Sequence, residues 1–404
     1  MILKQQWKVL KKMSKKRIVI VNNNLEIGGV QKALVSLIKE IADIYDTTLL
    51  LFSDTGVYLN EIPQNVKVIK CKSLYKYLGI SQSQCTSKKD YLIRGFLAFA
   101  TRLFGRDFVL KLISFSQKKL SNKYDCAISF LHNGGKKSFY GGCNEFVLNK
   151  INSDLKIGFL HCDYSSCGAN YKSNNKNYFK FDRIAACSDG CKNAFLNCLP
   201  ELSHKTFVVR NCYNFEKIKQ KSAEEAIVFD EKYVNIVSVA RLSKEKGINR
   251  GIIAVSEAIK QSVNVKYHIV GDGIERQGLK ELCKDLSIEE NVVFYGNQTN
   301  PYKYMTNADM LLLPSYHEAA PLVIDEARCL GLPVLTTATT SSEDMVEKTC
   351  CGWVCDNSQQ ALSQKLTELV INANVIKAKK EEMQNQKVTN EKALKEFCVL
   401  LEGN

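Results

Sequence analysis

The segment at residues 315–330, SYHEAAPLVIDEARCL, constrains the fold of this chain more than any other. Apolar runs at residues 310–313 and 333–336 flank it on either side. Short apolar runs bounded by turn residues are typical of buried strands, and the segment between them has the length of one helix. We therefore predict strand, polar loop, helix and second strand, the repeating unit of a parallel α/β sheet.

The start of the predicted helix has the features of an anion site. Pro321 is expected to be the first helical residue, where its missing N–H costs nothing. Ala320 before it is a poor N-cap, so the backbone amides of Leu322 and Val323 should lack a side-chain partner. Free amides at the positive end of a helix attract anions such as phosphates.

Two carboxylates flank this predicted anion site. Glu318 lies just before the helix, and Glu326 lies eight residues later within it. A phosphate site between two carboxylates fits a ligand with phosphates in the middle and hydroxyls at both ends, such as a nucleoside diphosphate sugar. The alternative is an ordinary helix packed on a sheet, with both glutamates on its solvated face.

The spacing of these glutamates resembles the E-x7-E signature of family 4 retaining glycosyltransferases, and the following LGLPV is similar to that family too. The resemblance implies a GT-B fold, in which two Rossmann-like domains with parallel sheets face each other across a cleft. It also implies that Glu318 contacts the donor sugar and Glu326 the ribose. Ala319 stands where the family usually has glycine, and its methyl group would narrow the sugar pocket.

A second cluster follows the predicted strand at residues 235–240. Arg241 and Lys246 lie five residues apart in a loop, and two cations so placed suit a diphosphate. The R-x4-K-G pattern also resembles the family's diphosphate-binding residues. The sequence contains no D-x-D, so we expect no metal, and the two cations must neutralise the leaving group. Gly271 follows the next strand, where close packing against a nucleobase is expected.

The N-terminal half offers further candidates at the ends of predicted strands, where open α/β sheets bind ligands. Gly28 and Gly29 occupy a strand-to-helix turn and, by the resemblance, face the donor phosphates. His161 ends another strand, and its counterpart in the family faces the reacting sugar. His132 and Asp163 are candidates for the acceptor side. A plain tight turn and a structural histidine are the competing interpretations.

The length of 404 residues exceeds what one hydrophobic core usually supports. We predict an N-terminal extension at residues 1–16, an acceptor-side domain at 17–212 and a nucleotide-sugar domain at 213–385. The remaining residues, 386–404, are expected to form a helix that crosses back to the first domain. The first 16 residues lack the apolar core of a secretory signal, so a cytoplasmic protein is expected.

The charge of the chain is uneven. Residues 1–212 contain 33 basic and 15 acidic residues, a net +18, and residues 213–404 contain 23 and 27, a net −4. A basic half implies an anionic partner, either nucleic acid or an anionic membrane at the inner face of the cell. The basic, aromatic segment at residues 91–115 is interpreted either as a membrane-surface helix or as two core helices, and the core interpretation is favoured.

The 16 cysteines lack the paired spacing of a metal site, so we expect free, mostly buried thiols. The sequence thus predicts a metal-independent retaining glycosyltransferase without a cofactor. The expected donor is a UDP-linked sugar and the expected acceptor a saccharide, lipid-linked, in capsule or O-antigen assembly. The alternatives are a GT-B sugar-nucleotide epimerase and a nucleic-acid-binding protein, although the chain contains no nucleic-acid module. An NAD-dependent oxidoreductase is disfavoured because no G-x-G-x-x-G follows a strand.

Overall fold

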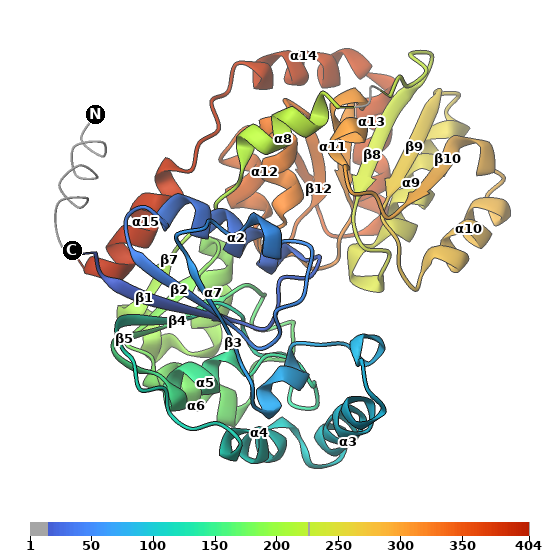
Figure 1. Cartoon of the computed structure of the whole chain (residues 1–404). Coiled ribbons are helices and arrows are strands. Elements are labelled where there is room, and N and C mark those ends of the chain that lie inside the picture. The colour runs from blue at the N-terminus through green and yellow to red at the C-terminus, as the bar shows by residue number, and fades with distance from the viewer. Residues whose placement is uncertain (1–14, 225–226, 404) are drawn as a thin grey trace. The chain divides into compact units, whose positions relative to one another are not determined.

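The computed structural model describes residues 15–224 and 227–403, which form two compact units (Figure 1). The first unit contains the residues up to Tyr213 and those from Asn390 onward, and the second contains Asn214–Thr389. Of the predicted N-terminal extension, residues 1–14 lie outside the described residues.

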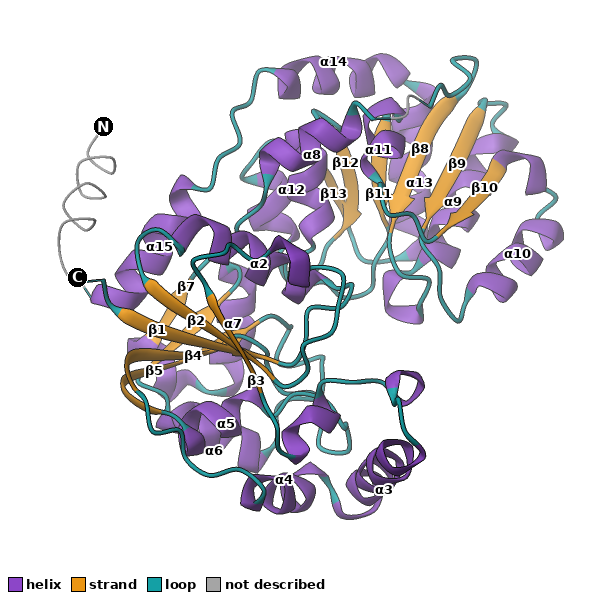
Figure 2. Cartoon of the chain, viewed as in Figure 1, coloured by secondary structure: helices purple, strands orange, loops and turns teal. Residues whose placement is uncertain are grey.

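The first unit is built on a parallel sheet of seven strands among the described residues, in the order β3-β2-β1-β4-β5-β6-β7 (Figure 2). The strands, in chain order, are β1 (Arg17–Asn22), β2 (Asp46–Leu51), β3 (Lys67–Lys70), β4 (Lys123–Ser129), β5 (Asn152–Leu160), β6 (Arg183–Ala186) and β7 (Thr206–Val208). Strands β1 and β2 are buried along five of their six residues, as expected for parallel strands covered on both faces.

Helices cover the first sheet and extend beyond it (Figure 2). They are α2 (Gly29–Ile41), α3 (Lys88–Phe104), α4 (Arg106–Phe115), α5 (Cys143–Lys150), α6 (Lys172–Lys180), α7 (Asp189–Cys198) and α15 (Glu391–Glu402), with the 3-10 turns η1 (Leu59–Glu61), η2 (Leu74–Leu78), η3 (Gln82–Gln84) and η4 (Pro200–Lys205). Several of these helices have an N-cap side chain. The Ser188 hydroxyl, for example, accepts a hydrogen bond from the amide of Cys191 at the start of α7.

The second unit repeats this plan with a parallel sheet of six strands among the described residues, in the order β10-β9-β8-β11-β12-β13. The strands are β8 (Val234–Val239), β9 (Val265–Val270), β10 (Val292–Gly296), β11 (Met310–Leu313), β12 (Val334–Thr337) and β13 (Gly352–Cys355). The helices are α8 (Phe215–Ser222), α9 (Ile248–Lys260), α10 (Arg276–Asp285), α11 (Tyr302–Asn307), α12 (Leu322–Cys329), α13 (Gln359–Ile371) and α14 (Ala373–Gln384), with the short turns η5 (Lys244–Lys246), η6 (Glu289–Asn291) and η7 (Glu343–Glu347).

The strand order locates the edge at which each sheet can bind a ligand. It reverses between β1 and β4 in the first unit and between β8 and β11 in the second. In open α/β sheets the carboxyl ends of the strands on either side of such a reversal form the ligand crevice. The loops after β8 and β11 carry Arg241, Lys246 and Glu318, so the strongest sequence candidates lie at the reversal in the second sheet.

The last helix, α15, lies in the first unit. The guanidinium of Arg210, after β7, forms ion pairs with Glu396 of this helix and with Asp189 of α7. At the start of α15 the Asn390 side chain accepts a hydrogen bond from the amide of Tyr213 at 2.9 Å and donates one to its carbonyl at 2.8 Å. The two points at which the chain leaves and re-enters the first unit are therefore tied together, four residues beyond the predicted boundary at residue 385.

The core interpretation of residues 91–115 is wrong, because Phe96, Phe99 and Phe115 are between 59 and 88% exposed. The segment forms α3 and α4, but the outward faces of both helices are apolar. All 16 cysteines are free thiols and most are buried, as predicted. Within the described residues, no helix is both long and apolar enough to cross a membrane.

Candidate functional site

The loops after β8 and β11 are held against each other by their backbones. The amide of Tyr316 donates a hydrogen bond to the carbonyl of Glu245 at 2.9 Å. Gly247, with φ of +60°, lies so close to Pro314 that a Cβ would stand 2.2 Å from its carbonyl oxygen. Only glycine fits there without displacing backbone. This close approach places the side chains of the two loops within reach of one another.

This close approach joins two of the residues predicted to bind the donor. The ammonium of Lys246 lies 2.7 and 2.9 Å from the two carboxylate oxygens of Glu318. The Ser315 hydroxyl donates a third hydrogen bond to Glu318, at 2.7 Å. The Glu318 side chain is only 6% exposed, whereas that of Lys246 is 26% exposed. A carboxylate held by a cation and a hydroxyl is fixed in place and has its negative charge partly neutralised, so it suits hydrogen bonding to ligand hydroxyls better than nucleophilic attack.

Helix α12 begins one residue later than predicted, and this corrects the role of Pro321. Pro321 is the N-cap and not the first helical residue, because its ψ of 117° is extended. No side chain caps this helix, so the amides of Leu322 and Val323 remain first-turn amides, as expected. Glu326 is buried in the same helix, at 4% exposure. Ala319 is half-buried in the loop that leads into it.

Sequence reasoning missed the residues that support this loop. The guanidinium of Arg250, from α9, lies over the Tyr316 ring at 4.6 Å from its centroid. It also donates a hydrogen bond to the Asn357 side chain at 2.7 Å, and Asn357 in turn donates to the Tyr316 carbonyl at 3.0 Å. Arg250 and Asn357 are 107 residues apart, and no local pattern relates them. Ser315 belongs to the segment at residues 315–330, but no sequence pattern indicated a role for its hydroxyl.

Gly271 holds the loop after β9 against the loops on either side. With φ of +136°, a Cβ at this position would stand 1.9 Å from the carbonyl oxygen of Ala240. Its amide donates a hydrogen bond to the Gly296 carbonyl at 2.8 Å. The carboxyl ends of β8, β9 and β10 therefore converge on this glycine. Arg241, the next residue after Ala240, is exposed to solvent.

In the first unit, Gly28 is the N-cap of α2 and Gly29 its first residue. No side chain caps this helix, as at the start of α12, and the first turn of α2 contains no acidic residue. The helix follows β1, one of the two strands at the reversal of the first sheet. Gly28 and Gly29 thus lie at the strand-to-helix turn that the sequence predicts.

The structure brings His132 and His161 together, at the ends of the adjacent strands β4 and β5. His161 lies against Phe130 and Phe159, with ring centroids 4.6 and 5.7 Å away. Burial, and then the charge of His132, lower the pKa of His161 to about 3. Burial, and then the charge of Arg106, lower the pKa of His132 to about 4. Both imidazoles are therefore neutral at pH 7, and each has one buried ring nitrogen without a hydrogen-bond partner.

Asp163 has a local structural role. Its Oδ1 accepts hydrogen bonds from the amides of Ser165 and Ser166, at 3.0 and 3.2 Å, and from the Ser165 hydroxyl at 2.5 Å. These bonds stabilise the turn that follows His161. The carboxylate of Asp163 therefore supports the loop at the predicted acceptor side.

The two depressed histidine pKa values make the stability of the first unit pH-dependent. An unfolded histidine binds a proton near pH 6.5, whereas folded His132 and His161 resist protonation until about pH 4 and 3. Stability is therefore lost as the pH falls below 6.5, with a slope of about 1.4 kcal/mol per pH unit for each histidine. Denaturant unfolding of wild type and His161→Phe measures this. The unfolding free energy of the variant should fall less steeply with decreasing pH, because the contribution of one histidine is gone. Equal slopes in the two proteins would contradict the depressed pKa of His161.

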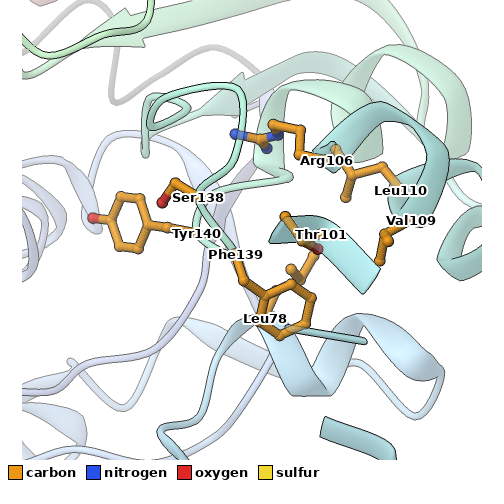
Figure 3. Close-up of a pocket in the computed structure, with 8 residues that line it drawn as sticks. All are labelled: Leu78, Thr101, Arg106, Val109, Leu110, Ser138, Phe139 and Tyr140. Carbon is orange, nitrogen blue, oxygen red and sulfur yellow. The ribbon is translucent and has the colours of Figure 1, made fainter. Parts of the chain in front are cut away.

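A buried arginine that the sequence analysis passed over lies beside this histidine pair. Arg106 is 2% exposed and donates a hydrogen bond to the Asn133 side chain at 2.7 Å, while Glu145 lies 3.7 Å away. Its Nε and Nη1 are buried without hydrogen-bond partners. Figure 3 shows the small pocket that Arg106 lines together with Leu78, Thr101, Val109, Leu110, Ser138, Phe139 and Tyr140.

Comparison with known proteins shows which class of protein this chain resembles. Residues 219–389 match the model of the family described as "Glycosyl transferases group 1". The matched region covers nearly all of the second unit, including Lys246, Glu318 and Glu326. The chain therefore resembles the group 1 glycosyltransferases in the unit that carries the E-x7-E pair, as the sequence analysis predicts.

Two curated relatives carry the names of glycosyltransferases. The chain is 33% identical over 142 residues to the putative colanic acid biosynthesis glycosyltransferase WcaL of Escherichia coli. The aligned region covers 33% of this chain and 35% of that protein. It is 24% identical over 320 residues, 78% of both chains, to the N-acetylgalactosamine-N,N'-diacetylbacillosaminyl-diphospho-undecaprenol 4-alpha-N-acetylgalactosaminyltransferase of Campylobacter jejuni. The matches to the first curated relatives span only 35 to 41% of their length.

Solved structures support the fold over almost the whole chain. Anabaena Alr3699/HepE in complex with UDP and glucose has a TM-score of 0.65 at 17% identity, covering 96% of this chain and all of that one. WaaG, a glycosyltransferase of lipopolysaccharide biosynthesis, has a TM-score of 0.61 with the same identity and coverage. The predicted GT-B fold, two Rossmann-like domains with parallel sheets, is confirmed.

Proposed function

We propose that this chain is a retaining, metal-independent glycosyltransferase that moves a sugar from a nucleoside diphosphate sugar to a saccharide acceptor. The observation that carries the proposal is the Lys246–Glu318 pair beside the uncapped start of α12, at the reversal of the second sheet. A cation, free amides and a fixed carboxylate stand where a donor needs a diphosphate contact and a sugar contact. UDP is the proposed nucleotide, because HepE, of the same fold, binds UDP and glucose.

The proposed mechanism assigns a role to each group. As the sugar departs, negative charge grows on the diphosphate, where Lys246, Arg241 and the amides of Leu322 and Val323 stabilise it. Glu318 accepts hydrogen bonds from sugar hydroxyls, and Glu326 accepts them from the ribose. The acceptor hydroxyl attacks from the side that the leaving group vacates, and a phosphate oxygen takes its proton, so the configuration at the anomeric carbon is retained.

The first unit supplies the acceptor side in this proposal. Neutral His161 offers a polar ring atom to the reacting sugar, with His132 beside it. The proposed acceptor is a lipid-linked saccharide, in line with the Campylobacter relative, whose printed name includes a diphospho-undecaprenol. A lipid-linked acceptor would require the protein to work at the inner surface of the cell membrane.

The release of nucleoside diphosphate tests the proposal. UDP-, GDP- and ADP-sugars are incubated with the protein, with and without a lipid extract from cells that make surface polysaccharide. We expect release from one donor class, stimulated by the extract and unchanged by a chelator such as EDTA. Inverted configuration in the product would refute the retaining mechanism. Absence of release from every donor would refute transfer.

A further inference from the structure

Helices α3 and α4 carry apolar side chains on the faces that point to solvent. The large apolar residues that are 42 to 88% exposed on these helices are Leu92, Phe96, Phe99, Leu103, Phe104, Phe108, Leu112 and Phe115. In α3 they recur at positions 92, 96, 99 and 103, which is the spacing of one helix face. In α4 positions 108, 112 and 115 repeat the same spacing. Such stripes normally face a protein core, so these two lack the partner that their pattern implies.

The face of α3 that turns toward the body of the protein carries both polar and apolar side chains, with Leu97, Ala100 and Thr101 buried. Asp90 accepts hydrogen bonds from Lys76 at 2.8 Å and from the Tyr77 hydroxyl at 2.7 Å. Arg94 donates from Nε to the Ile80 carbonyl at 2.7 Å. The helix is therefore held in place by these polar contacts together with Leu97 and Ala100, while its larger apolar side chains stay outside.

The two stripes form one continuous patch. The rings of Phe104, at the end of α3, and Phe108, in the first turns of α4, lie 5.4 Å apart between centroids. The opposite face of α4 is buried through Val109, Leu110 and Ile113, which fixes the direction in which its stripe points. Both helices lie at the outer edge of the first unit in Figure 1. We refer to the eight exposed apolar residues and the basic residues around them as the α3–α4 surface.

The charge around the patch is strongly positive. Residues 88–119 contain eight basic and two acidic residues, a net +6. The exposed basic residues are Lys88, Lys89, Arg102, Lys111, Lys118 and Lys119. Two copies of such a surface would repel each other, so the charge disfavours self-association through this face. A partner that is both anionic and apolar would match the basic residues and the apolar side chains of this surface.

We propose that the α3–α4 surface docks the protein on an anionic lipid bilayer, with both helices lying in the interface. Leucine and phenylalanine side chains would enter the boundary of the acyl chains, while lysines and arginines contact the headgroup phosphates. The half-exposed Tyr91 suits the headgroup level. This inference stands on exposed side chains and charges of the first unit, and it does not depend on the donor site.

Flotation of the full-length protein with lipid vesicles tests the proposal. We expect wild type to float with vesicles that contain phosphatidylglycerol and not with pure phosphatidylcholine. The triple variant Leu92→Ser, Phe96→Ser, Phe99→Ser should bind about a hundredfold more weakly. The triple variant Arg102→Gln, Lys111→Gln, Lys118→Gln should also weaken binding about a hundredfold. All six positions except Lys118 lie on α3 or α4, and all are exposed, so the fold should tolerate the changes.

Matched controls change exposed residues elsewhere. Phe179→Ser, Ile371→Ser, Val375→Ser controls for lost apolar area, and Lys260→Gln, Lys280→Gln, Lys284→Gln controls for lost charge. Flotation that is equal in all variants would overturn the proposal. The proposal would also be overturned if the two triple variants of the α3–α4 surface changed only self-association or RNA retention. The melting-temperature shift caused by UDP should persist in every variant, so its loss would count against the donor site and not against the membrane surface.

Discussion

Replacing Lys246 with methionine is expected to reduce sugar transfer by about two to three orders of magnitude. Removing one preorganised donor to the developing charge in other enzymes costs about that much. Methionine keeps the length and apolar stem of lysine but removes the ammonium. The Glu318 carboxylate, 6% exposed, would then keep only Ser315 among the partners described above. The donor site would lose its central cation and its sugar-binding carboxylate would lose its anchor.

The same substitution should lower the free energy of unfolding of the second unit by about 1–3 kcal/mol, because a buried carboxylate is left poorly compensated. The partial exposure of Lys246 keeps this figure below that of a fully buried pair. Lys244, two residues earlier in the same turn η5, is exposed and is the matched control. Lys244→Met should leave both turnover and stability close to wild type. Equal losses in the two variants would show that general charge, and not the Lys246–Glu318 pair, matters.

Replacing Gly271 with alanine should destabilise the second unit by about 3 kcal/mol and abolish nucleotide binding. An alanine Cβ would stand 1.9 Å from the Ala240 carbonyl oxygen, and the φ of +136° is unfavourable for any side chain. Relief requires the loops after β8 and β9 to separate. Arg241 directly follows Ala240, so the separation would also displace a predicted diphosphate contact. Denaturant unfolding and UDP titration measure the two effects.

Gly278, seven residues later, provides the control. It lies in helix α10, and a Cβ built on it meets no atom within 4 Å. Gly278→Ala should stabilise the protein by about 0.5–1 kcal/mol, since alanine favours a helix and glycine does not. A Gly271→Ala protein as stable as wild type would show that the loops after β8 and β9 can rearrange freely.

Much of the fold was predictable because parallel strands buried on both faces are short, apolar and bounded by turn residues. Strand β11, Met310–Leu313, lies where the sequence places it, and strand β8, Val234–Val239, lies within one residue of its predicted position at 235–240. The same patterns located the loops that carry Lys246 and Glu318. The contact between these two residues was not predicted, because it depends on how closely Gly247 lets the loops approach.

The rest of the site depends on contacts that no sequence period encodes. Arg250 and Asn357 meet across the second unit only after β8, β11 and β13 pair into one sheet. The neutral state of His161 follows from burial against rings of two strands, which spacing alone does not reveal. The core interpretation of residues 91–115 was wrong because an apolar helical period marks a buried face without saying what buries it.

The most direct test is the melting temperature of wild type and Glu326→Ala with UDP, GDP, ADP and NAD in turn. A ligand at 100 times its dissociation constant adds about 2.7 kcal/mol, or roughly 5–11 °C for a unit of this size. We expect a shift with one nucleoside diphosphate that is lost in Glu326→Ala and retained in the control Glu347→Ala, which removes an exposed glutamate. If none of the nucleoside diphosphates shifted the melting temperature, or if the shift survived in Glu326→Ala, the donor site proposed for the second unit would be contradicted.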